Sequence, residues 1–244
     1  SDPESIEQIS KQSEATHGGS LMLDAAIELP DYTESMDVHL MPGNYQGTED
    51  SGAEAGAVYD NGLEVFSFGV MGKNLDDIGH SMANYTRLKW PQLRPQLIVD
   101  VGCTIGHNTL PWKQTFPNAD VHGLDVAPSC LQYGHARAEA FAVPIHFRQA
   151  SCEALPYEDG SVDVVFSSMF LHELPTHLIR AFFQEAHRVL KPGGVLINME
   201  LPPNDVLGAY DAFYLDWDCF YNNEPFYKEF RDLSYPKLCT DAGF

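Results

Sequence analysis

The middle of the chain alternates short apolar runs with segments of helical period. Apolar runs rich in β-branched residues are typical of buried parallel strands. We expect such strands at residues 97–101, 119–124, 145–148, 162–167 and 195–199. Helical patterns occupy 128–141 and 177–190 between them. This alternation predicts an α/β fold for residues 97–201, with a Rossmann-like, doubly wound, mostly parallel sheet that carries helices on both faces.

The segments on either side of this core have other patterns. Residues 1–60 are polar and acidic without a sustained period, which indicates a loosely ordered N-terminal arm. Residues 61–96 are more apolar, and we expect a helical lead-in that covers a substrate. Residues 202–244 begin an aromatic segment with helical spacing. This helix packs on the core, forms an aromatic wall over the substrate, or does both with different rings, and Tyr214 and Trp217 are the expected substrate contacts.

A glycine turn follows the first strand, in the sequence D-V-G-C-T-I-G from Asp100 to Gly106. Helix N-termini bind carboxylates and phosphates, and a glycine such as Gly102 lets a ligand approach the backbone closely. Asp100 would repel a pyrophosphate but attract an ammonium group. The turn therefore suits a ligand with both an amino group and a carboxylate better than a dinucleotide, and it lacks the G-x-G-x-x-G spacing of nicotinamide-dependent oxidoreductases. Such an oxidoreductase is kept as a less favoured alternative.

The second strand ends at Asp125, which lies 19 residues after Gly106. An acidic residue at this place can accept hydrogen bonds from both ribose hydroxyls of a nucleoside. The alternative is that Asp125 caps the helix that follows.

Taken together, these motifs resemble the class I S-adenosylmethionine-dependent methyltransferases, of the small-molecule type called methyltransferase type 11. Four motifs carry the resemblance, at residues 100–106, 121–125, 150–156 and 159–174. Two positions depart from the family pattern, because Thr104 stands where a third glycine is usual and Ser151 where an acid is usual. These departures leave open a non-catalytic scaffold of the same fold.

The resemblance implies S-adenosyl-L-methionine as the cofactor and S-adenosyl-L-homocysteine as the product. The cofactor-binding residues that it implies are Asp100, Gly102, Cys103, Thr104, Gly106, Asp125, Val126, Ser151, Cys152, Glu153 and Ser168. In the family the fourth strand ends beside the transferred methyl group, so Met169 and His172 are expected to contact the substrate. The expected acceptor is a small, aromatic or apolar metabolite, methylated on oxygen, carbon or nitrogen.

Methyl transfer from a sulfonium needs mainly proximity and orientation. His172 is the candidate base for an acceptor that must lose a proton, and the alternative is a supporting polar or helix-capping role. His172 and Glu173 together with His177 resemble the H-E-x-x-H zinc motif, but the two histidines are five residues apart with Pro175 between them. We therefore expect no metal site.

Charge and cysteine content narrow the function classes. The chain of 244 residues has 35 acidic against 14 basic side chains, and a net charge of −21 disfavours nucleic-acid and membrane-surface partners. Five widely spaced cysteines without a C-x-x-C pair indicate a reducing compartment. With no leader pattern and no run of about 18 apolar residues, we expect a cytoplasmic protein.

The sequence given stops where the family adds its last two strands, so either a tail follows it or the sheet lacks its final strands. An uncovered sheet edge favours pairing with a second copy, which makes a homodimer an open expectation.

Overall fold

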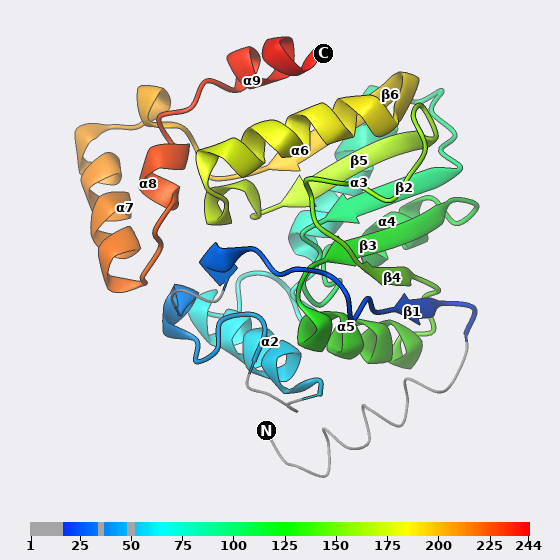
Figure 1. Cartoon of the computed structure of the whole chain (residues 1–244), viewed down its shortest axis with the longest axis horizontal. Coiled ribbons are helices and arrows are strands. Elements are labelled where there is room, and N and C mark those ends of the chain that lie inside the picture. Colours follow the sequence, from blue (N-terminus) through cyan, green and yellow to red (C-terminus); the bar gives the residue numbers. More distant parts are fainter. Residues whose placement is uncertain (1–16, 34–36, 48–51) are drawn as a thin grey trace.

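The computed structural model describes residues 17–33, 37–47 and 52–244 of the chain (Figure 1). Six strands form one sheet in the order β1-β4-β3-β2-β5-β6, and every neighbouring pair is parallel. The strands are β1 (Ser20–Met22), β2 (Leu97–Val101), β3 (Asp120–Asp125), β4 (His146–Gln149), β5 (Val162–Ser168) and β6 (Leu190–Met199). The predicted α/β fold with a parallel sheet is confirmed. The bounds of β6 differ most from the prediction. The strand begins at Leu190, before Pro192 and Gly193, whereas the sequence predicts a start at Val195.

Helices cover both faces of the sheet, as Figure 1 shows. The helices are α2 (Glu54–Phe66), α3 (Asp77–Lys89), α4 (Leu110–Thr115), α5 (Pro128–Ala140), α6 (Thr176–Val189), α7 (Ala209–Tyr221), α8 (Tyr227–Phe230) and α9 (Tyr235–Ala242). Short 3₁₀ turns lie at Asp31–Thr33 (η1), Val38–Leu40 (η2), Leu171–Glu173 (η3) and Asn204–Val206 (η4).

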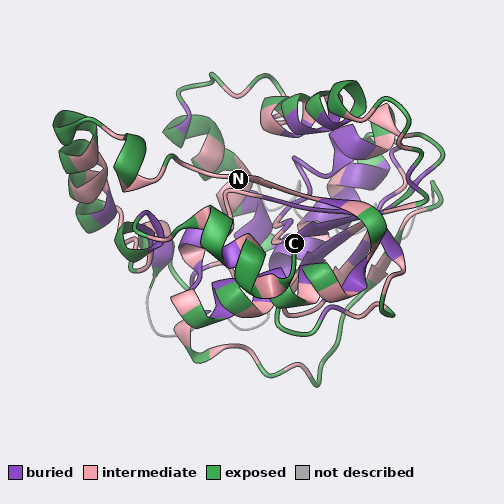
Figure 2. Cartoon of the chain, turned by 90° about the horizontal axis from the view of Figure 1, so that it is seen from above, coloured by how far each residue is buried: buried purple, intermediate pink, exposed green. Residues whose placement is uncertain are grey.

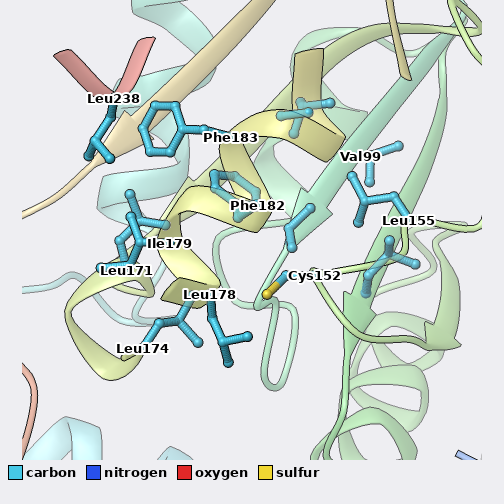
Figure 3. Close-up of a cluster of buried hydrophobic side chains, with 14 of the residues drawn as sticks. Val99, Cys152, Leu155, Leu171, Leu174, Leu178, Ile179, Phe182, Phe183 and Leu238 are labelled. Atoms are coloured by element: carbon cyan, nitrogen blue, oxygen red, sulfur yellow. The ribbon is translucent and has the colours of Figure 1, made fainter. Parts of the chain in front are cut away.

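Successive side chains of β2 enter two different cores, because neighbouring residues of a strand point to opposite faces. Ile98 packs with residues of α3, α4 and α5, whereas Val99 packs with residues of α6 (Figure 3). Phe182 and Phe183 of α6 are almost fully buried in the same core as Val99. Figure 2 shows the buried residues gathered along the sheet and on the inner sides of the helices. The central strands β2 and β5 are therefore buried on both faces, which is why the sequence shows them as continuous apolar runs.

Within its described part, the N-terminal segment contains a short strand that the polar sequence does not predict. β1 pairs in parallel with β4 at the edge of the sheet, with Ser20 opposite His146. The Ser20 backbone N–H donates to the Ile145 carbonyl at 3.1 Å, and the Ser20 hydroxyl lies 2.9 Å from His146 Nδ1. Three residues are too short to show a period, and the existing edge of β4 supplies the pairing. Residues 1–16, 34–36 and 48–51 of the expected loose arm lie outside the described residues, so for them the expectation stays a prediction.

The aromatic helix predicted after residue 202 forms as α7, but its rings do not pack into the core. Cys219 is its one buried residue. Tyr214 and Trp217 stack on each other with ring centroids 6.1 Å apart and are each about half exposed. The buried Arg231 holds α7 through an ion pair with Asp216.

β6 forms the edge of the described sheet opposite β1. Pairing of this edge with a second copy stays a prediction. Among the described helices, none combines the length and apolar character needed to cross a bilayer.

Candidate functional site

A covered pocket lies at the carboxyl ends of β2, β3 and β5. In parallel sheets, ligands bind at this end, where the chain switches from one side of the sheet to the other. Six of the residues expected from the sequence line it: Gly102, Thr104, Asp125, Val126, Ser168 and Met169. Its volume of about 80 Å³ is below the roughly 300–1,000 Å³ of typical small-molecule sites. A ligand of nucleoside size therefore needs side chains of the pocket to move.

The N-terminal segment supplies the other wall of the pocket, and the sequence gives no local signal for it. The lining residues before the core are Tyr32, Thr33, Val38, Asn44, Tyr45, Gln46 and Tyr59. They precede the 61–96 segment that we expect to cover the substrate. Asn44 Oδ1 and Gln46 Oε1 are buried without a hydrogen-bond partner. Because buried acceptors are normally paired, these two oxygens suit a ligand that offers N–H or O–H groups.

The glycine turn after β2 is held by the neighbouring strand. The backbone N–H groups of Gly102 and Cys103 both donate to the Leu124 carbonyl, at 2.8 and 3.0 Å. Gly102 has φ +78°, and a Cβ atom built on it would lie 2.2 Å from the Phe170 ring. Phe170 thus occupies the space that the glycine leaves open beside the turn.

Thr104 has φ +45°, a left-handed conformation that is unfavourable for a β-branched residue by about 1–3 kcal/mol. Its backbone N–H donates to Asp125 Oδ2 at 2.8 Å, which holds the residue in place. The turn therefore accommodates Thr104 in place of the family's glycine, at the cost of a strained backbone conformation at this residue.

Asp125 ends β3 and faces the pocket. Besides the bond from Thr104, its Oδ1 atom accepts the backbone N–H of Ala127 at 2.9 Å, just before α5 begins. Burial raises the pKa of Asp125, while the backbone N–H groups that bond it act in the opposite direction. Contacts with the loop and the start of the next helix thus exist without a ligand, and binding of a ribose by Asp125 stays a prediction.

Asp100 lies behind the turn rather than in the pocket lining. The Thr109 hydroxyl donates to Asp100 Oδ2 at 2.5 Å, while Oδ1 is buried without a partner. Burial raises the pKa of Asp100 to about 8, against the opposing effect of the Thr109 bond. An uncompensated buried carboxylate is unfavourable for stability.

Replacing Asp100 by Asn is therefore expected to stabilise the ligand-free protein. Because the pKa of Asp100 in the folded protein lies above the ordinary 3.8, folding favours the protonated carboxyl group. The contribution of Asp100 to the free energy of unfolding is therefore fully present below about pH 4 and is lost as the pH rises through 8. The stabilisation should grow from near zero at low pH to about 1–3 kcal/mol near pH 9. Urea unfolding of both proteins across this range measures it, with Asp120→Asn on the exposed end of β3 as control. If the difference in unfolding free energy between Asp100→Asn and the wild type did not change with pH, the prediction would be contradicted.

The other expected cofactor residues lie outside the pocket lining. Ser151, Cys152 and Glu153 follow β4, and Cys152 is buried in the core beside α6. Cys103 is buried in the other core, and a Cβ atom on Gly106 would lie 2.7 Å from the Phe147 ring. Their contacts with a cofactor stay predictions.

His172, the candidate base, is buried on η3 and does not line the pocket. Its Nδ1 atom lies 2.8 Å from Glu200 Oε2, and Glu200 Oε1 accepts the backbone N–H groups of Phe170 and Leu171. Burial alone would lower the pKa of His172, but Glu200 outweighs it and raises the pKa to about 9. The ligand-free geometry therefore favours the supporting role over that of a free base, and the catalytic role stays a prediction.

This sheet order, with a glycine turn after β2 and an acid at the end of β3, defines the fold of a class I methyltransferase. A family model described as "Methyltransferase domain" matches residues 98–194. Residues 98–194 are therefore similar to a methyltransferase domain, in a chain with the class I methyltransferase fold.

The chain is similar to curated methyltransferases over about half of its length, and solved structures share its fold. The chain is 38% identical over 125 residues to a malonyl-(acyl-carrier protein) O-methyltransferase of Hahella chejuensis, covering 50% of this chain and 40% of that protein. It is 34% identical over 120 residues to a demethylmenaquinone methyltransferase of Thermus thermophilus, covering 49% and 53%. The chain thus spans about half the length of these relatives. The fold is shared with phosphoethanolamine N-methyltransferase 2 of Haemonchus contortus, solved with S-adenosyl-L-methionine, at a TM-score of 0.57 and 21% identity over 76% of this chain and 41% of that one.

Proposed function

We propose that this protein transfers a methyl group from S-adenosylmethionine to a small molecule and releases S-adenosylhomocysteine. The observation that carries the proposal is the convergence of Gly102, Asp125 and Met169 on one covered pocket, from the loops after three adjacent strands. These loops come from the segment that matches the methyltransferase domain.

The residues of the pocket fit the groups of this cofactor. The Asp125 carboxylate would accept the ribose hydroxyls, and the turn from Gly102 to Gly106 would hold the methionine end. The unpaired acceptors Asn44 Oδ1 and Gln46 Oε1 suit the amino or hydroxyl donors of such a ligand. When bound, the cofactor supplies a methyl group already activated on a sulfonium.

The acceptor would bind on the η3 side of the pocket. Met169, Phe170 and Leu174 provide apolar surface there, and Tyr45 and Glu173 provide polar groups. This mixture supports a small, partly apolar or aromatic acceptor that the protein holds and orients. Tyr214 and Trp217 stay candidate substrate contacts, although they lie on the exposed part of α7 in this structure. The charge of −21 supports a small molecule over a nucleic acid as acceptor.

Calorimetry with the purified chain tests the cofactor. We expect one equivalent of S-adenosylhomocysteine to bind, and a nicotinamide dinucleotide not to displace it. No binding at high ligand concentration, or displacement by the dinucleotide, would refute the proposal. Release of S-adenosylhomocysteine from S-adenosylmethionine in a mixture of phenolic, carboxylate and amine acceptors, above a control without acceptors, would exclude the non-catalytic scaffold.

A further inference from the structure

Two histidines and three glutamates gather beside the pocket, from four separate parts of the chain. His39 belongs to η2, and His172 and Glu173 belong to η3. Glu200 follows β6, and Glu224 follows α7. Glu173 also lines the pocket and accepts the Tyr45 hydroxyl at 2.8 Å.

Three of these residues present their ligand atoms to one another. His39 Nε2 lies 2.9 Å from Glu173 Oε1, and His39 Nδ1 lies 3.2 Å from Glu224 Oε1. One ligand atom from each of the three lies within 4.8 Å of the other two. A single ion between them could therefore reach all three residues with small side-chain shifts.

The carboxylate of Glu224 gives a second, separate observation that points to a cation. Its side chain is only 6% exposed, yet its Oε2 atom has no hydrogen-bond partner. Withdrawing a carboxylate oxygen from water without a partner is costly. The cluster lacks a positive group at this oxygen.

His172 is arranged in the way that metal-binding histidines often are. Its Nδ1 atom lies 2.8 Å from Glu200 Oε2, and its Nε2 atom lies 3.9 Å from Glu173 Oε1. A carboxylate on one ring nitrogen commonly fixes the orientation of a histidine whose other nitrogen faces a metal. A further nitrogen is thus available next to the three-residue cluster.

We propose that His39, Glu173 and Glu224 bind one divalent transition-metal ion, of the Zn²⁺ or Mn²⁺ type. One imidazole and two carboxylates form a donor set that suits such ions. The ion joins the N-terminal segment to η3 and to the loop after α7, at the edge of the pocket where the acceptor would bind. This inference goes beyond methyl transfer and does not rest on it.

This proposal departs from the expectation of no metal site, which was drawn from local spacing and which the metal-content experiment below tests. His177, the residue tested in that pattern, is exposed and takes no part in the cluster. The histidine that faces Glu173 lies 134 residues earlier in the chain. Spacing along one helix cannot reveal such a pair.

Metal content of the 244-residue chain tests the proposal without any cofactor or acceptor. The protein is stripped with a chelator, dialysed against Zn²⁺ or Mn²⁺, and measured by elemental analysis and calorimetry. We expect one equivalent of ion, with affinity at least about tenfold weaker in His39→Gln and in Glu224→Gln. The matched controls His177→Gln and Glu158→Gln, both at exposed positions, should bind as the wild type does.

The wild-type protein provides a measurement that does not depend on whether the variants fold. Co²⁺ should bind with visible absorption bands typical of nitrogen and oxygen ligands, and Zn²⁺ should displace it. Absence of ion binding by the wild type, full binding by folded His39→Gln and Glu224→Gln, or a cobalt spectrum with strong thiolate bands would each overturn the proposal. Failure of S-adenosylhomocysteine to bind would leave these results unchanged, so the two proposals fail separately.

Discussion

Replacing Asp125 by Asn is expected to lower the affinity for S-adenosylhomocysteine by about 100-fold or more. Asn keeps the shape of the side chain but removes its charge and one of its two acceptor oxygens. Two hydrogen bonds from hydroxyls to a carboxylate each contribute about 1.5–3 kcal/mol, and about 3 kcal/mol corresponds to a factor of about 100 in the dissociation constant. Calorimetry on the purified variant measures the change.

Asp120→Asn is the matched control for this experiment, because Asp120 begins the same strand and is exposed. It should bind the ligand as the wild type does. Urea unfolding of both variants separates lost binding from lost folding, since Asp125 also accepts the backbone N–H groups of Thr104 and Ala127. Wild-type affinity in a folded Asp125→Asn protein would show that Asp125 only holds the loop and the helix start.

Replacing Gly102 by Ala is expected to destabilise the protein by about 2–5 kcal/mol. A residue other than glycine in the left-handed region costs about 1–2 kcal/mol, and overpacking of a dense region adds about 1–3 kcal/mol. Both apply here, because Gly102 has φ +78° and its added methyl group would meet the Phe170 ring at 2.2 Å. Urea unfolding measures the loss.

Gly160→Ala separates the two contributions. Gly160 has φ +61°, but a Cβ atom there meets nothing within 4 Å. It should therefore show only the backbone cost of about 1–2 kcal/mol. Adding Phe170→Ala to the Gly102→Ala protein should remove the overpacking. The double variant should therefore lose less free energy of unfolding than the sum of the losses in the two single variants. Simple additivity would show that the ring moves aside at no cost.

The strands and turns of residues 97–199 were predictable because their causes are local. β2 and β5 are buried on both faces, so the apolar runs appear directly in the sequence. Asp125 ends β3 and Met169 follows β5, and parallel pairing brings such positions to one edge of the sheet. The fold and the position of the glycine turn could therefore be inferred together.

The cover of the pocket and the cluster at Glu173 were not predictable, because their contacts join distant segments. Tyr45 and His39 reach Glu173 across more than a hundred residues of chain, and neither lies in a periodic element. The helical period of α7 predicts a helix but does not identify what its rings contact. Most of its aromatic residues remain exposed.

The pairing of β1 with β4 has a consequence for the order of folding. Ser20 has to meet His146 across 126 residues, so this strand can be placed only after its partner has been made and seated in the sheet. During synthesis β1 remains unpaired until β4 has been made. The N-terminal segment, which also lines the pocket, is thus placed late in folding, and the pocket is complete only after the strands at its base have formed.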